Sequence, residues 1–164
     1  MTEPEVDRSP SSPEPTLRHA IRHVSRVYQA QFRTRLNAHG IGDAEYVAMF
    51  VIRRLPGISS AELARWNGVT TQASFATVKQ LHDAGLIIRY PSPTHGKIVC
   101  TELSERGHEV MIACEQQANE LEKEMCRAMN VQDRIELERL LLSCAEGLGE
   151  PIAPVGAVLG MPPR

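Results

Sequence analysis

The sequence lacks the long apolar runs that would place it in a membrane or in a secretory pathway. No stretch of about 18 consecutive apolar residues occurs in the 164-residue chain, which argues against a membrane span. The first 15 residues are polar and rich in proline, without the apolar stretch of a signal peptide. The expected compartment is therefore the cytoplasm.

Compact catalytic motifs are missing as well. The chain has no Walker loop, dinucleotide-binding fingerprint, nucleophile elbow, His-Glu-x-x-His or Cys-x-x-Cys sequence. Carboxylates are frequent near Glu122, but they alternate with Lys123 and Arg127, which is typical of a solvated helix face rather than an acid–base pair. We therefore expect neither an enzyme nor a bound cofactor.

The charge distribution is uneven although the net charge is only −2. Apolar residues make up 42% and charged residues 23%, which is ordinary for a single globular domain of this length. Residues 51–100 contain six basic and two acidic side chains, whereas residues 101–150 contain five basic and twelve acidic ones. A basic middle within an acidic frame is compatible with local contact to a polyanion.

Periodicity predicts a mainly α fold with one small β hairpin. Residues 1–15 and 147–164 are rich in proline, serine or glycine, and we expect them to be loose tails around one domain spanning 16–146. Within it, 43–103 forms the central module between long terminal helices at 16–38 and 104–146. The predicted helices cover 16–38, 43–55, 60–66, 71–84, 104–129 and 131–146, and the predicted strands cover 86–90 and 97–101.

Several helix starts carry recognisable capping signals. Ser59 and Glu62 have the spacing of a capping box, the segment Asn130-Val131-Gln132-Asp133 is expected to cap the last helix, and Thr16 is a candidate cap for the first helix.

The short helix at 60–66, the Asn67-Gly68 turn and the helix at 71–84 have helix-turn-helix spacing. One side of the second helix, with Ser74, Thr77, Val78 and Leu81, is suited to pack inward. In a DNA major groove, the other side would bring Phe75 to thymine methyl groups and Gln72 to adenine. The alternative is that Phe75 packs on a neighbouring helix and that the rest is a solvated face. Candidate DNA-contacting residues in this segment are Ser60, Thr70, Thr71, Gln72, Phe75, Ala76 and Lys79.

The hairpin supplies a second candidate DNA contact. Its tip contains His95 and Lys97, and Arg89 precedes it on the rising strand. A cationic finger of this kind can lie along a phosphate backbone or enter a minor groove. The alternative is a plain surface hairpin whose lysine blunts a sheet edge.

Together these segments resemble the winged-helix core of the MarR (multiple antibiotic resistance regulator) family. The resemblance covers about 130 residues and is carried by SSAELA, GVTTQ, LHDAGLI and LSERG within residues 58–107. It implies a homodimer that binds a pseudo-palindromic DNA operator, usually as a repressor, and that is released by small phenolic or aromatic acids. Many members hold an Asp-x-Arg pair in the wing. Here the matching residues are His95-Gly96-Lys97, which makes Lys97 the substitute contact.

Dimerisation also has a physical argument, because both ends of the domain carry apolar stripes. We expect Leu17, Ile21 and Val24 to pack against Leu137, Leu140 and Leu141 of a second copy. Two recognition helices would then reach major grooves about 34 Å apart. The alternative is that the stripes close a monomeric core.

The resemblance also implies a ligand pocket between the dimer helices and the winged helix. Candidate lining residues are His19, His23, Tyr28, Tyr46, Met49 and Arg53, with Arg53 suited to pair with a carboxylate. The alternative is that the tyrosines and Met49 belong to the core.

Two other function classes remain open. His19 and His23 have metal-compatible spacing, but no third ligand follows nearby, so no metal site is predicted. Cys100, Cys114, Cys126 and Cys144 leave a redox-responsive regulator possible, with Cys144 as a partner for another cysteine. The remaining alternative is a protein–protein adaptor that uses the winged helix without DNA.

Overall fold

The computed structural model describes residues 16–93, 96 and 98–149. Its secondary structure is mainly helical, as the sequence predicts, with one small sheet. In chain order the elements are α1 (Leu17–Ala38), α2 (Asp43–Arg54), β1 (Ile58–Ser59), α3 (Ser60–Asn67), α4 (Thr71–Asp83), β2 (Ile87–Pro91), β3 (Val99–Leu103), α5 (Glu105–Met125) and α6 (Val131–Gly147).

The sheet has three antiparallel strands in the order β1-β3-β2. Strands β2 and β3 form the predicted hairpin, in which Arg89 lies opposite Thr101. Strand β1 was not predicted, because two residues are too few to show a period. It pairs with the free edge of β3, where Ile58 lies opposite Thr101.

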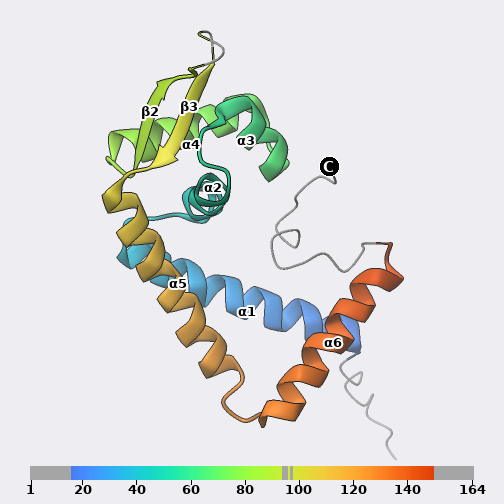
Figure 1. The fold of residues 1–164 in the computed structure, drawn as a ribbon. Helices are drawn as coiled ribbons and strands as arrows, with labels where there is room; N and C mark the ends of the chain where they lie inside the picture. Colours follow the sequence, from blue (N-terminus) through green and yellow to red (C-terminus); the bar gives the residue numbers. More distant parts are fainter. Residues whose placement is uncertain (1–15, 94–95, 97, 150–164) are drawn as a thin grey trace, which may run out of the picture.

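The core lies between the sheet and the helices α2, α3, α4 and the first half of α5. Its fully buried members come from every one of these helices and include Met49, Ile52, Leu63, Leu81 and Met111. Figure 1 shows this winged-helix lobe at one end of the molecule, with the hairpin extending beyond it. The helix-turn-helix unit is thus anchored on its inner side, which leaves its outer side free.

Helix α5 begins in close contact with the α4–β2 turn. The Ser104 hydroxyl caps α5 by accepting from the Gly107 N–H at 3.0 Å and donates to the Gly85 carbonyl at 2.7 Å. A Cβ at Gly107 would lie 2.0 Å from the Leu86 carbonyl oxygen. The serine and glycine of the LSERG segment therefore fix the direction in which α5 leaves the lobe.

Most capping predictions are confirmed. Ser59 and Glu62 form a reciprocal capping box at the start of α3, and Asn130 and Asp133 form another at the start of α6. Thr16 was predicted to cap α1, but its side chain makes no cap hydrogen bond to the helix backbone. Its hydroxyl instead lies 3.0 Å from Nδ1 of His19.

Beyond the lobe, α5 and α6 form a V that α1 crosses (Figure 1). Helix α5 ends at Met125, four residues earlier than predicted, because 126–130 form a turn in which Asn130 already caps α6. Helix α6 extends to Gly147, one residue into the predicted tail, and has no buried residue. The predicted tails at 1–15 and 150–164 lie outside the described residues. In the part of the chain that the structure describes, no helix is long and apolar enough to cross a membrane.

Candidate nucleic-acid interface

The inner side of α4 is fixed by burial and by one hydrogen bond. Ser74, Val78 and Leu81 are buried, as predicted, whereas Thr77 is only half-buried. The Ser74 hydroxyl donates to the Ser60 carbonyl at 3.0 Å and so connects α4 to α3. This bond sets the rotation of α4 about its axis.

The outer side of α4 is exposed along its whole length. It presents the side chains that the sequence assigned to the major groove, which are Thr71, Gln72, Phe75, Ala76 and Lys79. The alternative in which Phe75 packs on a neighbouring helix does not hold, because 53% of its surface is exposed. Aromatic side chains are enriched where a surface binds a partner, so Phe75 is a candidate contact residue.

Two hydroxyl groups near this surface differ in their availability. The Thr70 side chain accepts from the Ala73 N–H at 3.2 Å and thereby caps α4. The Ser60 Oγ has no hydrogen-bond partner among the described residues, although it is enclosed. The Thr70 oxygen is therefore used by the helix cap, and the Ser60 hydroxyl, which was predicted to contact DNA, is enclosed rather than exposed at this surface.

The two cations on this surface are held differently. Lys79 Nζ lies 2.5 Å from Asp83, one helical turn further on, and this hydrogen bond lowers the pKa of the Asp83 carboxyl. Arg89 makes no ion pair with any described residue, and the sequence from 89 to 101 contains no acidic side chain. Lys79 is thus partly neutralised, whereas the Arg89 charge is not.

Arg89 lies beside the ring of Phe75. Its guanidinium carbon is 6.0 Å from the ring centroid, within the range of a cation–π contact. The Arg89 Nε and the Thr101 hydroxyl directly opposite it are both enclosed and have no hydrogen-bond partner among the described residues. Phe75 and Arg89 were predicted as separate DNA contacts, and their mutual contact was not predicted, because it joins a helix and a strand.

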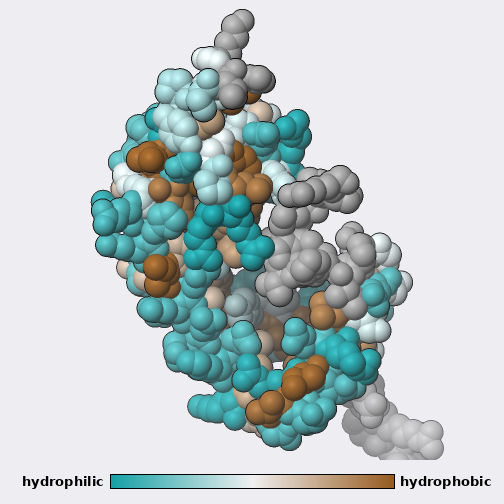
Figure 2. All heavy atoms as spheres, in the orientation of Figure 1, coloured by the Kyte–Doolittle hydropathy of each residue, from teal (hydrophilic) through white to brown (hydrophobic). Residues whose placement is uncertain are grey.

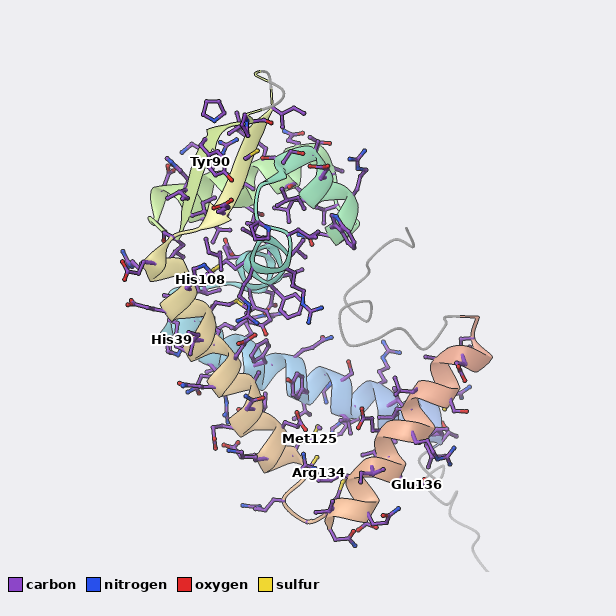
Figure 3. All side chains as sticks on the ribbon, viewed as in Figure 1. His39, Tyr90, His108, Met125, Arg134 and Glu136 are labelled. Carbon is purple, nitrogen blue, oxygen red and sulfur yellow. The ribbon has the colours of Figure 1, made fainter. Side chains whose placement is uncertain are left out.

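The outward side of the hairpin is stiffened by a cross-strand hydrogen bond. The Tyr90 hydroxyl, labelled in Figure 3, donates to Glu102, which raises the pKa of the tyrosine to about 12. His95 and Lys97, which were predicted to contact DNA from the tip, lie outside the described residues.

The residues predicted to dimerise reach the surface on α1 and α6. Leu17, Ile21, Val24, Leu140 and Leu141 are between 41% and 67% exposed. Leu137 is half-buried. Figure 2 shows apolar side chains at the surface around the α5–α6 end of the molecule, separated from those of the lobe by hydrophilic ones. In a single chain, these stripes do not close a core.

An open cavity of about 670 Å³ separates α6 from the end of α5. Its walls are mainly apolar and include Tyr28, Met125, Cys126 and Leu141. Figure 3 shows Met125 and Arg134 on the facing ends of the two helices. Leu137 and Leu141 of the α6 stripe also line this cavity, so the cavity adjoins the predicted dimer surface.

Of the predicted ligand residues, His23 and Tyr28 line one cavity of about 220 Å³ between α1 and α5, and the others lie elsewhere. Met49 is buried in the core, and His19 and His23 are exposed on α1. Tyr28, Phe32 and Tyr46 pack as a ladder of rings with centroid distances of 5.9 and 5.1 Å. Burial and the nearby Glu115 carboxylate raise the pKa of Tyr46.

Arg53, the predicted carboxylate partner, is already bound within the chain. Its guanidinium donates two hydrogen bonds to Glu115 of α5, at 2.8 and 2.5 Å. Both side chains are about one-third exposed. No local sequence pattern indicates this pair, because its members are 62 positions apart.

The cysteines occupy contrasting environments. Cys100, Cys114 and Cys126 are buried, and Cys144 is exposed, with no disulfide among them. Burial raises the pKa of the Cys114 thiol, which makes it less reactive. No group of three metal-ligating side chains occurs within residues 16–93, 96 and 98–149.

Comparison with known proteins gives one consistent family. The MarR family model matches residues 39–98, which contain the whole helix-turn-helix and strand β2 and end just before β3. The HTH-type transcriptional repressor Rv2887 of Mycobacterium tuberculosis is 27% identical over 125 residues, covering 76% of this chain and 90% of the repressor.

Solved structures agree with the sequence relatives. Wild-type MarR from E. coli superimposes with a TM-score of 0.68 at 23% identity, over 77% of this chain and 93% of MarR. Rv2887 solved in complex with DNA gives a TM-score of 0.66 at 26% identity, over 82% and 98%. Its complex with salicylic acid gives 0.63 at 27% identity, over 84% and 98%. The family model, the relatives and the winged-helix fold agree: over residues 39–98 this chain matches the MarR family.

Proposed function

We propose that this protein is a transcriptional regulator that binds a specific duplex DNA operator as a homodimer. The observation that carries the proposal is the outer side of α4, where the five predicted contact residues are all exposed on a rigidly packed helix. Rv2887, the similar repressor, has been solved in complex with DNA. Helix α4 is the candidate recognition helix, and the β2–β3 hairpin is the candidate wing.

A second copy of the chain would bury the exposed apolar side chains of α1 and α6. Exposed leucine, isoleucine and valine side chains lie on these helices, and an open, mainly apolar cavity lies between α5 and α6. A twofold dimer would bury both stripes and place two α4 helices on one duplex. A single winged-helix module buries little DNA surface, so the second module also supplies affinity.

The proposal is tested by fluorescence anisotropy with a labelled duplex from the chain's own upstream promoter, titrated at several salt concentrations. We expect binding that weakens with salt and exceeds binding to a scrambled duplex. Lys97→Glu should weaken binding to every sequence and flatten the salt dependence. Gln72→Ala should instead relax the preference at one base position, at about 1–3 kcal/mol. Absence of duplex binding at low salt would favour the adaptor alternative.

We further propose that a small aromatic acid regulates the dimer near α2 and α5, as salicylic acid binds the similar repressor Rv2887. The residues that support this are the Arg53 guanidinium and the half-buried ring of Tyr46 on α2. A ligand carboxylate at Arg53 would displace Glu115 and thereby loosen the link between the winged helix and α5.

Salicylate added to the anisotropy titration should weaken operator binding by the wild type. Arg53→Gln should remove that response, while His82→Gln, an exposed change on α4 away from this pair, should retain it. A response that persists in Arg53→Gln would place the ligand elsewhere.

A further inference from the structure

The contact between Phe75 and Arg89 joins the recognition helix to the wing. Phe75 lies on the exposed side of α4, and Arg89 lies on β2, on the sheet face that carries Thr101. The guanidinium carbon is 6.0 Å from the centre of the ring.

The positive charge of Arg89 is not neutralised by an ion pair with any described residue. Every arginine or lysine that the structure ties to a carboxylate lies on a helix, and Arg89 is not one of them. Its Nε is enclosed and unpartnered, and so is the hydroxyl of Thr101 opposite. The inner part of the side chain is therefore held by packing, and only a ring steadies its charged end.

We propose that Phe75 is a positioning residue that holds the Arg89 guanidinium beside the recognition surface, ready to contact a DNA phosphate. The inference rests on the proposed DNA-binding function and refines it, because the two residues act as one unit. Arg89 supplies the positive charge, and the ring restricts the orientations that the guanidinium samples before DNA arrives. An arginine that is ordered in advance loses less conformational entropy when it binds.

The competing role for Phe75 is direct contact with thymine methyl groups in the major groove. The two roles differ in what Phe75 depends on. A positioning residue loses its effect when Arg89 is absent, and it acts on any duplex because phosphates carry no sequence. A base contact is independent of Arg89 and acts only on the specific operator.

A double-mutant cycle separates these roles. Duplex affinity is measured by anisotropy for the wild type, Phe75→Leu, Arg89→Gln and the double variant, on both the operator and a scrambled duplex. We expect Phe75→Leu to weaken binding by about two- to fivefold per subunit on both duplexes, the range of an exposed cation–π contact. In the Arg89→Gln background, Phe75→Leu should have no further effect.

The role of Arg89 itself is read from the salt dependence. Loss of one phosphate contact lowers the slope of log affinity against log salt by about 0.9, so Arg89→Gln should lower it by about 2 in a dimer. Phe75→Tyr keeps the ring and should behave as the wild type. Lys79→Gln provides the matched control, because Lys79 is a cation on the same helix without the ring, and its effect should add to that of Phe75→Leu.

The outcomes distinguish this inference from the proposed function. Salt-dependent wild-type binding with additive effects of Phe75→Leu and Arg89→Gln would overturn the positioning role alone. Loss of binding with Phe75→Leu on the operator only would likewise assign Phe75 to base contact. Absence of wild-type binding to any duplex would overturn the DNA-binding function and this inference with it. Thermal unfolding of each variant shows whether it folds. Where a variant fails to fold, duplex affinity is compared between the wild type and Phe75→Tyr.

Discussion

At Gly107 the start of α5 lies in close contact with the turn between α4 and β2. The glycine lies in the first turn of α5, against the backbone that links α4 to β2. The contact is needed because Ser104, three residues earlier, donates to the Gly85 carbonyl at 2.7 Å. Any side chain at 107 would push this turn and the start of α5 apart.

Gly107→Ala should therefore destabilise the protein, by about 1–3 kcal/mol for an overpacked site. The added methyl group would lie 2.0 Å from the Leu86 carbonyl oxygen, which belongs to the backbone and cannot rotate away. Urea unfolding at fixed protein concentration measures the change. Gly147→Ala, at a helix end with no neighbouring atom within 4 Å, is the matched control and should be neutral or slightly stabilising. Equal stability of the two variants would contradict the close packing.

At the scale of elements, α3 is a short helix whose start depends on its cap. The Glu62 N–H donates to the Ser59 hydroxyl at 3.3 Å, and Glu62 Oε2 accepts from the Ser59 N–H at 3.0 Å. The hydrogen bonds from Ser59 lower the pKa of the Glu62 carboxyl. Since the Ser74 hydroxyl binds the carbonyl of Ser60 in the same turn, this cap also supports the placement of α4.

Ser59→Ala should cost about 1 kcal/mol of stability at pH 7, the usual value for an N-cap. The wild type should also lose part of this contribution in acid. Because the folded pKa of Glu62 is depressed, its contribution is fully present above the unfolded pKa of about 4.3 and is lost as pH falls through the folded value.

Urea midpoints between pH 7 and pH 3 measure this effect. The stability difference between the wild type and Glu62→Gln should shrink as the solution becomes acidic. Glu109→Gln, an exposed change on α5 that is not part of a cap, should show no comparable trend. A difference that stays constant over this range would contradict the role of the Glu62 carboxylate in the cap.

For the whole molecule, the arrangement of α6 decides whether the chain functions alone or in pairs. Helix α6 has no buried residue, and its apolar side chains border an open groove instead of the core. Within one chain it is held mainly by its connection to α5 and by the exposed ion pair of Arg134 with Glu122 at 2.9 Å. Exposed ion pairs contribute little stability, so other packing contacts are needed to hold α6 in place.

Leu140→Glu should convert the proposed dimer to a monomer, because it would bury an unpaired carboxylate in the α1–α6 interface. Sedimentation velocity measures the change of mass, and operator affinity should fall together with it. Gln132→Glu adds the same charge near the start of α6, outside the predicted dimer stripe, and should leave the mass unchanged. A wild type that sediments as a monomer at micromolar concentration would contradict the interface.

The amino-acid sequence by itself determined the helices, the hairpin and the outward face of α4, since these follow from local periodicity, caps and turns. Ser59 and Glu62 are three positions apart, and the exposed side of α4 repeats every three or four residues. Contacts between distant segments were decided only in the tertiary structure. Arg53 meets Glu115, Phe75 meets Arg89, and β1 pairs with β3, although nothing near each residue marks its partner. The physical reason is that a local pattern records which face of an element is buried, whereas the identity of the opposing residue depends on how the elements pack against each other.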